Sequence, residues 1–245
     1  MKELNYSERR LEVNVENYTG AVKNVQHFDL VQLEVIPEPL EKWCDMKGHN
    51  LLKLFYENPK KTNFLFQHYV QLTRLMDTIK KLKSQGNDFD FGNNGARVRI
   101  MERSLQNNRY CFIEMARKQG DLEDAEHSVL VEWYNWLESN LDLKLDVIIY
   151  LQTEPGVVYS RMKSRGRSEE ATVPLEYLTA LHDTYENWLV NQNPEDPSRK
   201  QEVVVVNANQ GKEEVFEEAK TRLMEHFKKN RPEIFCAHEG SYVLE

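Results

Sequence analysis

The chain has 245 residues and a formal net charge of −8, with 40% hydrophobic and 29% charged residues. These values are ordinary for a soluble globular protein and sufficient for one compact domain, which we take to span residues 1–245. The negative charge, without a basic stripe along any predicted helix, argues against a nucleic-acid polymer or an anionic membrane as a partner.

Short β-rich runs alternate with longer helical patterns along the chain. The candidate strands are residues 11–15, 31–36, 97–101, 146–151 and 202–207. The last two are continuous apolar runs, as expected of strands that are buried on both faces. This alternation predicts an α/β fold in which a parallel sheet is covered by helices.

Between the strands, apolar residues recur at three- and four-residue spacing, which predicts amphipathic helices. We interpret these stripes as core-facing: Leu65, Tyr69, Leu72, Met76, Ile79 and Leu82; Val129, Leu130, Trp133 and Leu137; Leu178, Leu181, Tyr185 and Trp188; Val215, Phe216, Ala219, Leu223 and Phe227. Residues 84–96 and 192–199 are rich in Gly, Asn, Asp or Pro and are predicted loops.

Polar clusters follow three of the candidate strands, where open α/β sheets bind their ligands. Glu38 stands between two prolines after the second strand, Glu102 and Arg103 follow the third, and an arginine-rich helix follows the fourth. Each has an ordinary alternative, since turn carboxylates and charged helix faces are commonly just solvated.

The arginine spacing also has a chemical rationale. Arg161 and Arg165 are four apart and share a helical face, and Arg167 follows Gly166, where a helix can open. Three converging guanidinium groups suit a phosphoryl group in transfer. Glu169 and Glu170 follow and offer two carboxylates that could accept hydrogen bonds from sugar hydroxyl groups.

Many ordered stretches resemble the deoxynucleoside kinases, most closely the thymidine kinase and multisubstrate branch. The motifs include PEPLEKW at residues 37–43, FQHYVQLT at 66–73 and MERS at 101–104, and they continue at 109–112, 132–134, 149–151, 161–170, 173–178 and 182–189. The resemblance covers roughly residues 30 to 228. It implies a P-loop kinase-like, three-layer fold with a five-stranded parallel sheet. It also implies a homodimer that transfers the γ-phosphate of ATP, with Mg²⁺, to the 5′-hydroxyl of a deoxynucleoside.

The resemblance also implies roles for individual residues. Glu38 matches the general base, Arg103 the arginine at the reacting hydroxyl, and Glu102 the acidic residue associated with magnesium. The substrate pocket is matched by Gln67 at the base edge, by Trp43, Val70 and Phe112 as its walls, and by Tyr56 and Glu170 at the sugar 3′-hydroxyl. Arg161, Arg165 and Arg167 match a lid, residues 155–172, over the phosphates.

Two pocket positions depart from the thymidine-preferring pattern. Arg74 and Asn108 stand where that branch has methionine and a small residue. Both add bulk and polarity, and they resemble the deoxycytidine and deoxyguanosine kinase side of the family. We therefore expect a thymine methyl group to be accepted less well than cytosine or a purine.

The phosphate loop departs further. A loop of the form Gly-x-x-x-x-Gly-Lys-Ser/Thr is expected after the first strand, because its backbone N–H groups and lysine hold phosphates. Within the divergent region 1–28 only Gly20 keeps its place, while Ala21 replaces the lysine and Val22 the hydroxyl residue. Losing one preorganised donor typically costs ~3–4 kcal/mol of transition-state stabilisation, so we expect slow ATP-dependent turnover.

Three explanations remain open at this point. The chain is an active kinase whose N-terminus is an alternative or mispredicted one, a pseudokinase that binds nucleoside, or a purely structural subunit. Retained catalytic-type residues favour the first, and degeneration confined to the phosphate loop favours the second.

The three cysteines, Cys44, Cys111 and Cys236, are widely spaced and predict neither a zinc site nor a disulfide framework. The first ten residues mix both charge signs and predict neither a signal peptide nor a transit peptide. We expect a reducing compartment, cytoplasmic or mitochondrial. Residues 229–245 are predicted to be a tail.

Overall fold

The fold is a parallel α/β sandwich, seen in a computed structural model that describes residues 10–16, 31–84, 96–191 and 202–230. Its strands are β1 (Arg10–Glu16), β2 (Val31–Ile36), β3 (Ala96–Glu102), β4 (Val147–Gln152) and β5 (Val203–Asn207). They form one sheet in the order β2-β3-β1-β4-β5, with every pair parallel. Each predicted strand agrees with the structure to within one residue at either end.

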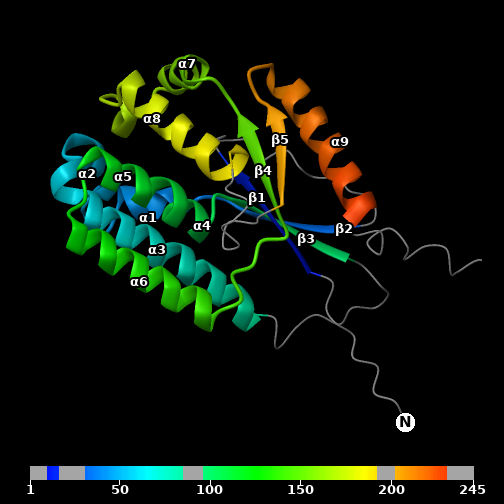
Figure 1. Cartoon of the computed structure of the whole chain (residues 1–245), viewed down its shortest axis with the longest axis horizontal. Helices are drawn as coiled ribbons and strands as arrows, with labels where there is room; N and C mark the ends of the chain where they lie inside the picture. Colours follow the sequence, from blue (N-terminus) through cyan, green and yellow to red (C-terminus); the bar gives the residue numbers. More distant parts are fainter. Residues whose placement is uncertain (1–9, 17–30, 85–95, 192–201, 231–245) are drawn as a thin grey trace, which may run out of the picture.

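Helices cover both faces of this sheet. They are α1 (Leu40–Cys44), α2 (Leu51–Glu57), α3 (Pro59–Ser84), α4 (Leu105–Asn107), α5 (Glu114–Gln119), α6 (Asp124–Asn140), α7 (Pro155–Arg165), α8 (Leu175–Tyr185) and α9 (Lys212–Asn230). Two π-helical segments, η2 (Asn108–Ile113) and η4 (Glu186–Val190), and a 3₁₀ turn, η3 (Ser168–Glu170), complete the described elements. Figure 1 shows α9 beside β5 on one side and the longer helices α3, α6 and α8 on the other.

The core explains why β4 is apolar throughout. Val147, Ile148 and Tyr150 are fully buried, and the ring of Tyr150 stacks on Tyr185 of α8 at a centroid distance of 5.7 Å. Burial of continuous apolar side chains from both faces of a strand is what stabilises a central parallel strand. The prediction of a doubly covered sheet is confirmed.

The prediction that the α3 stripe faces the core is wrong in part. Leu65, Leu72 and Met76 are 49%, 41% and 45% exposed, and Val129 on α6 is 51% exposed. Polar residues occupy much of the buried face of α3 instead: Asn63, Gln67, Gln71 and Thr73. Polar side chains are buried on α3 because this face of the helix contributes to the cavity described below, which Gln67 lines.

Some predictions fall outside the described residues. These are the phosphate loop with Gly20, most of the predicted loops 84–96 and 192–199, and most of the tail. Within the described residues, no helix is both long and apolar enough to cross a membrane.

Candidate active site

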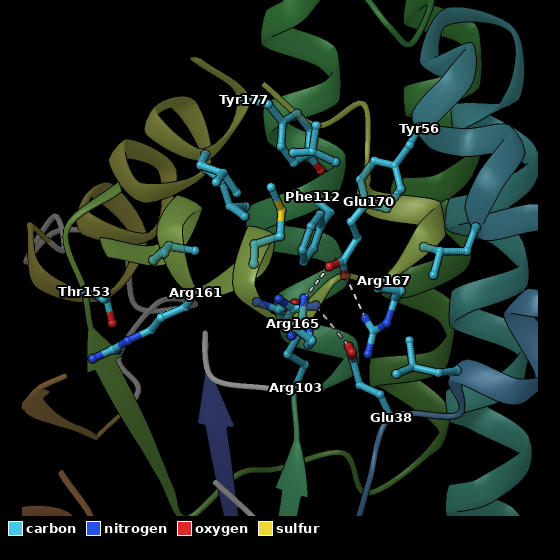
Figure 2. Close-up of a pocket in the computed structure, with 18 of the residues that line it drawn as sticks. Glu38, Tyr56, Arg103, Phe112, Thr153, Arg161, Arg165, Arg167, Glu170 and Tyr177 are labelled. Atoms are coloured by element: carbon cyan, nitrogen blue, oxygen red, sulfur yellow. Dashed lines mark hydrogen bonds and ion pairs between the residues drawn. The ribbon is translucent and has the colours of Figure 1, made fainter. Parts of the chain in front are cut away.

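A cavity of about 640 Å³ opens at the carboxyl end of the sheet. Glu38 after β2, Arg103 after β3 and Thr153 after β4 all line it, as do residues from α3, η2, α7 and the start of α9. Figure 2 shows their side chains around one space. Ligand binding at this edge is the rule for open α/β sheets, and the sequence-predicted residues Glu38, Gln67 and Arg103 share this one cavity.

Glu38 is held by two arginines. Its side chain is 2% exposed, and its Oε1 atom accepts hydrogen bonds from Arg74 Nη2 at 2.7 Å and Arg103 Nη1 at 3.1 Å. The flanking residues Pro37 and Pro39 prevent the strand and the helix from continuing through this position. A buried carboxylate with two cationic donors is fixed in position at the cavity wall.

Arg103 sits on an unusual backbone. Its φ angle is 56°, in the left-handed region that residues with a Cβ atom adopt at a cost. Arg74 Nη1 stabilises this turn by donating to the carbonyl oxygens of Glu102 at 3.0 Å and of Arg103 itself at 2.8 Å. The Arg103 guanidinium lies 5.1 Å from the ring centroid of Phe112, a cation–π distance.

Arg74 and Asn108, the two predicted pocket positions, both line the cavity. The Arg74 guanidinium donates to Glu38 and to the two carbonyl groups, and it lies 5.5 Å from the ring centroid of Trp43. Arg74 thus holds the Glu38 carboxylate and the turn after β3 in place through hydrogen bonds. The sequence did not reveal these partners, because they depend on the conformation of Arg103.

Three buried side-chain amides form a chain beside this group. Gln67 Oε1 accepts from Asn108 Nδ2 at 2.6 Å, and Gln67 Nε2 donates to Asn63 Oδ1 at 3.0 Å. Asn108 begins the π-helical segment η2, a feature that often occurs at functional sites. Gln67 and Asn108 line the cavity, and Asn63, which sequence reasoning missed, lies one turn behind Gln67 on α3.

The predicted aromatic walls also lie at the cavity. Trp43 is buried, its ring meets Phe66 edge to face at 5.7 Å, and its Nε1 atom donates to Thr73 Oγ1 at 2.9 Å. Phe112 and Val70 line the same space. These contacts hold a flat apolar surface of the kind on which a planar ring packs.

Tyr56 and Glu170, predicted as a pair, are close enough to influence each other. Burial, and next the negative charge of Glu170, raise the pKa of Tyr56 to about 12, so the phenol is protonated at neutral pH. The Glu170 carboxylate accepts from Arg165 Nη2 at 2.5 Å and Arg167 Nη1 at 2.7 Å. Both arginines are thus tied to a residue of the cavity wall.

Arg161 does not converge with the other two arginines. Its guanidinium donates to the carbonyl oxygens of Ala208 and Gln210, both at 2.6 Å. In Figure 2 it points toward Thr153, away from Glu170. The shared helical face predicted from the spacing exists on α7, but the side chains of Arg161 and Arg165 diverge from it.

Glu102, at the end of β3, is not among the residues that line the cavity. Burial, and next the charge of Glu38, raise the pKa of its carboxyl group. Within the described part of the chain, no group of three or more His, Cys, Asp or Glu residues is arranged to hold a metal ion. Magnesium takes one or two carboxylates together with water and phosphate oxygens. Because Glu102 is not among the lining residues and lies near Glu38, Arg74 and Arg103, its magnesium role remains a prediction from the resemblance.

The structure adds cavity residues that the sequence argument missed. Thr153 directly follows β4, and the strand-end rule was sufficient to find it. Gln210 and Gly211 lie between β5 and α9, and Lys212, the first residue of α9, brings a lysine to the cavity wall. Tyr177 of α8 is also part of the lining.

Comparison with known proteins gives a consistent result. A family model described as deoxynucleoside kinase matches residues 25–230. Over 202 residues the chain is 35% identical to "Thymidine kinase 2, mitochondrial" of Homo sapiens, covering 82% of this chain and 68% of that protein. It is 39% identical over 159 residues to the Macaca fascicularis protein of the same name, covering 64% of this chain and 55% of the relative. It is 31% identical over 201 residues to "Deoxycytidine kinase" of Homo sapiens, covering 74% and 75%.

Proposed function

The chain belongs to the deoxynucleoside kinase family, and on that premise we propose that it transfers the γ-phosphate of ATP to the 5′-hydroxyl of a deoxynucleoside. The observation that carries the proposal is the shared cavity of Glu38, Arg103 and Gln67. The cavity thereby combines a carboxylate that can accept a hydroxyl proton, a cation that can contact a phosphoryl group and an amide that can hydrogen-bond a nucleobase. The names of the relatives reported above are all names of kinases, and they lend no support to an inactive pseudokinase.

Glu38 and Arg103 have complementary tasks in this reaction. The Glu38 carboxylate takes the proton of the 5′-hydroxyl as that oxygen bonds to the γ-phosphorus, and ADP departs with the electron pair of the broken P–O bond. Arg103, 3.1 Å from Glu38, places a positive charge beside the same oxygen. Because catalysis of phosphoryl transfer is mainly positioning and charge stabilisation, this pair accounts for the acceptor side of the reaction.

The nucleoside seat is built from planar and polar groups. Trp43 and Phe112 would hold the base between them, with Gln67 at its hydrogen-bonding edge. Protonated Tyr56 would donate to the sugar 3′-hydroxyl, and Glu170 would accept from it. The polar, amide-lined end of the pocket supports cytosine or a purine over thymine, whose methyl group finds no apolar partner in Asn108.

The phosphate donor has cationic residues on the other side of the cavity. Arg165 at the end of α7, Arg167 just before η3 and Lys212 at the start of α9 line the wall. Magnesium, when bound, would neutralise charge on the phosphates of ATP. The resemblance assigns Glu102 to it. The phosphate loop lies outside the described residues, so its expected effect on the rate remains a prediction from the sequence.

Two measurements test this function. Calorimetric titration of the purified chain with deoxycytidine and with thymidine is expected to show saturable binding of at least the first. Incubation with radiolabelled ATP and magnesium is expected to yield a labelled nucleoside 5′-monophosphate. Nucleoside binding without any labelled product would refute phosphate transfer, and absence of binding would refute the nucleoside pocket as well.

The chain also has a surface suited to a homodimer. Five exposed apolar side chains on α3 and α6 form what we call the α3–α6 face: Leu65, Leu72, Met76, Val129 and Trp136. The two helices lie side by side in Figure 1, and stacked rings of His68, Trp133 and Trp136 connect them. A contiguous apolar face on one molecule pairs with its own copy in a two-fold dimer.

Substitution Leu72→Glu is expected to shift the protein from dimer to monomer, because a carboxylate would be buried against a second apolar face. Multi-angle light scattering after gel filtration measures the mass. Leu175→Glu on α8 is the matched control, since Leu72 and Leu175 are both 41% exposed. A wild-type protein that is monomeric at every concentration, or an L72E variant that stays dimeric, would contradict this interface.

For the compartment, two of the relatives reported above carry the word "mitochondrial" in their names. That favours the mitochondrion over the cytoplasm for this chain.

A further inference from the structure

The amide chain Asn63–Gln67–Asn108 has a direction. Each link uses one N–H group and one carbonyl oxygen, and it runs from Asn108 Nδ2 to Gln67 Oε1 and from Gln67 Nε2 to Asn63 Oδ1. All three residues are at most 3% exposed. Because each amide can present its nitrogen or its oxygen to a neighbour, the orientation of one amide determines that of the next.

At one end of this row of amides, a hydrogen-bond acceptor has no partner. Asn108 Oδ1 is buried and has no hydrogen-bond partner among the described residues. Asn108 lines the cavity, whereas Asn63 is not among the lining residues. A buried acceptor without a partner is costly, and a ligand that donates to it recovers that cost.

From this arrangement, and on the basis of the proposed function, we infer that Asn63 is a positioning residue that selects bases bearing an exocyclic amino group. By accepting from Gln67 Nε2, Asn63 holds Gln67 Oε1 toward Asn108, which in turn leaves Asn108 Oδ1 as an acceptor for the ligand. An amino group donates to this oxygen. A keto oxygen at the same position would face it acceptor to acceptor.

Two substitutions of Asn63 separate this role from simple packing. Aspartate has only acceptor atoms when ionised, so Asn63→Asp keeps the observed direction and forbids the reverse one. Alanine has neither donor nor acceptor, so Asn63→Ala frees Gln67 to turn and lets Asn108 present its N–H group to a keto oxygen. The two variants should therefore move base selectivity in opposite directions.

The readout is the ratio of Kd for thymidine to Kd for deoxycytidine, measured by calorimetry at about pH 8, well above the ordinary Asp pKa. We expect this ratio to be roughly tenfold higher in N63D than in N63A, the effect of one unsatisfied buried group. Asn140→Asp, on an exposed residue at the end of α6, is the matched control and should leave the ratio unchanged. Circular dichroism verifies that each variant is folded.

The results with the wild type and with the two Asn63 variants test the role of Asn63 separately from the proposed function. Equal ratios in N63D and N63A, with clear nucleoside binding by the wild type, would overturn the role of Asn63 alone. Absence of nucleoside binding by the wild type would overturn both. Should N63D be unfolded, Asn63→Ala against the wild type still decides the matter, because an unchanged ratio overturns the inference and a lower one supports it.

Discussion

Replacing Glu38 by glutamine is expected to slow phosphate transfer by about 10²–10⁴-fold, the usual contribution of a general base. Glutamine has nearly the same shape and keeps an oxygen that can accept from Arg74 and Arg103. It cannot take up the proton of the 5′-hydroxyl. The nucleoside Kd should change little, because in the proposed reaction Glu38 contacts the 5′-hydroxyl and not the nucleobase.

Single-turnover transfer from radiolabelled ATP gives the rate, and calorimetry gives the Kd. Glu41→Gln is the control, since Glu41 is exposed on α1 only three residues from Glu38. A Glu38→Gln variant with the wild-type rate would show that another group accepts the proton. A variant that loses nucleoside binding would assign Glu38 to the substrate seat instead.

A second large effect is expected on stability. Substitution Arg74→Met removes a cation whose side chain is 10% exposed from a carboxylate that is 2% exposed. Breaking a buried ion pair from one side typically costs 3–5 kcal/mol, and because Arg103 still contacts Glu38 we expect about 3 kcal/mol of lost unfolding free energy. Two main-chain carbonyl groups also lose their donor.

Urea denaturation measures the difference in unfolding free energy. Arg117→Met is the comparison, because the Arg117–Asp124 pair is 49% and 89% exposed. Exposed pairs contribute about 0–1 kcal/mol, so this control should change the unfolding free energy little. Equal losses in the two variants would mean that burial of the Glu38 group does not determine the strength of its ion pairs.

The sheet was predictable because its signals are local. Continuous apolar runs such as residues 147–150 mark strands that are covered on both faces, and polar residues directly after a strand mark the ligand edge. Position after a strand therefore predicted that Glu38 and Arg103 lie at the cavity, which is confirmed, and the motifs imply the roles proposed for them.

What the sequence could not show depends on contacts between distant segments. The partners of Arg74 lie 28 to 36 residues away and follow from the turn at Arg103. The stripe on α3 was assigned to the core because hydrophobicity usually marks the buried face. That rule fails on the part of α3 near the cavity, where the polar residues Asn63 and Gln67 are buried and Gln67 lines the cavity.

The left-handed backbone at Arg103 favours glycine, whereas its contact with Glu38 requires an arginine side chain. Glycine would relieve a conformational cost of roughly 1–2 kcal/mol, but it would also delete the guanidinium group that reaches Glu38. Introducing glycine at position 103 to stabilise the fold is therefore expected to remove the side chain to which we assign charge stabilisation in phosphate transfer. At residue 103, the backbone conformation and the role proposed for the side chain therefore favour different residues.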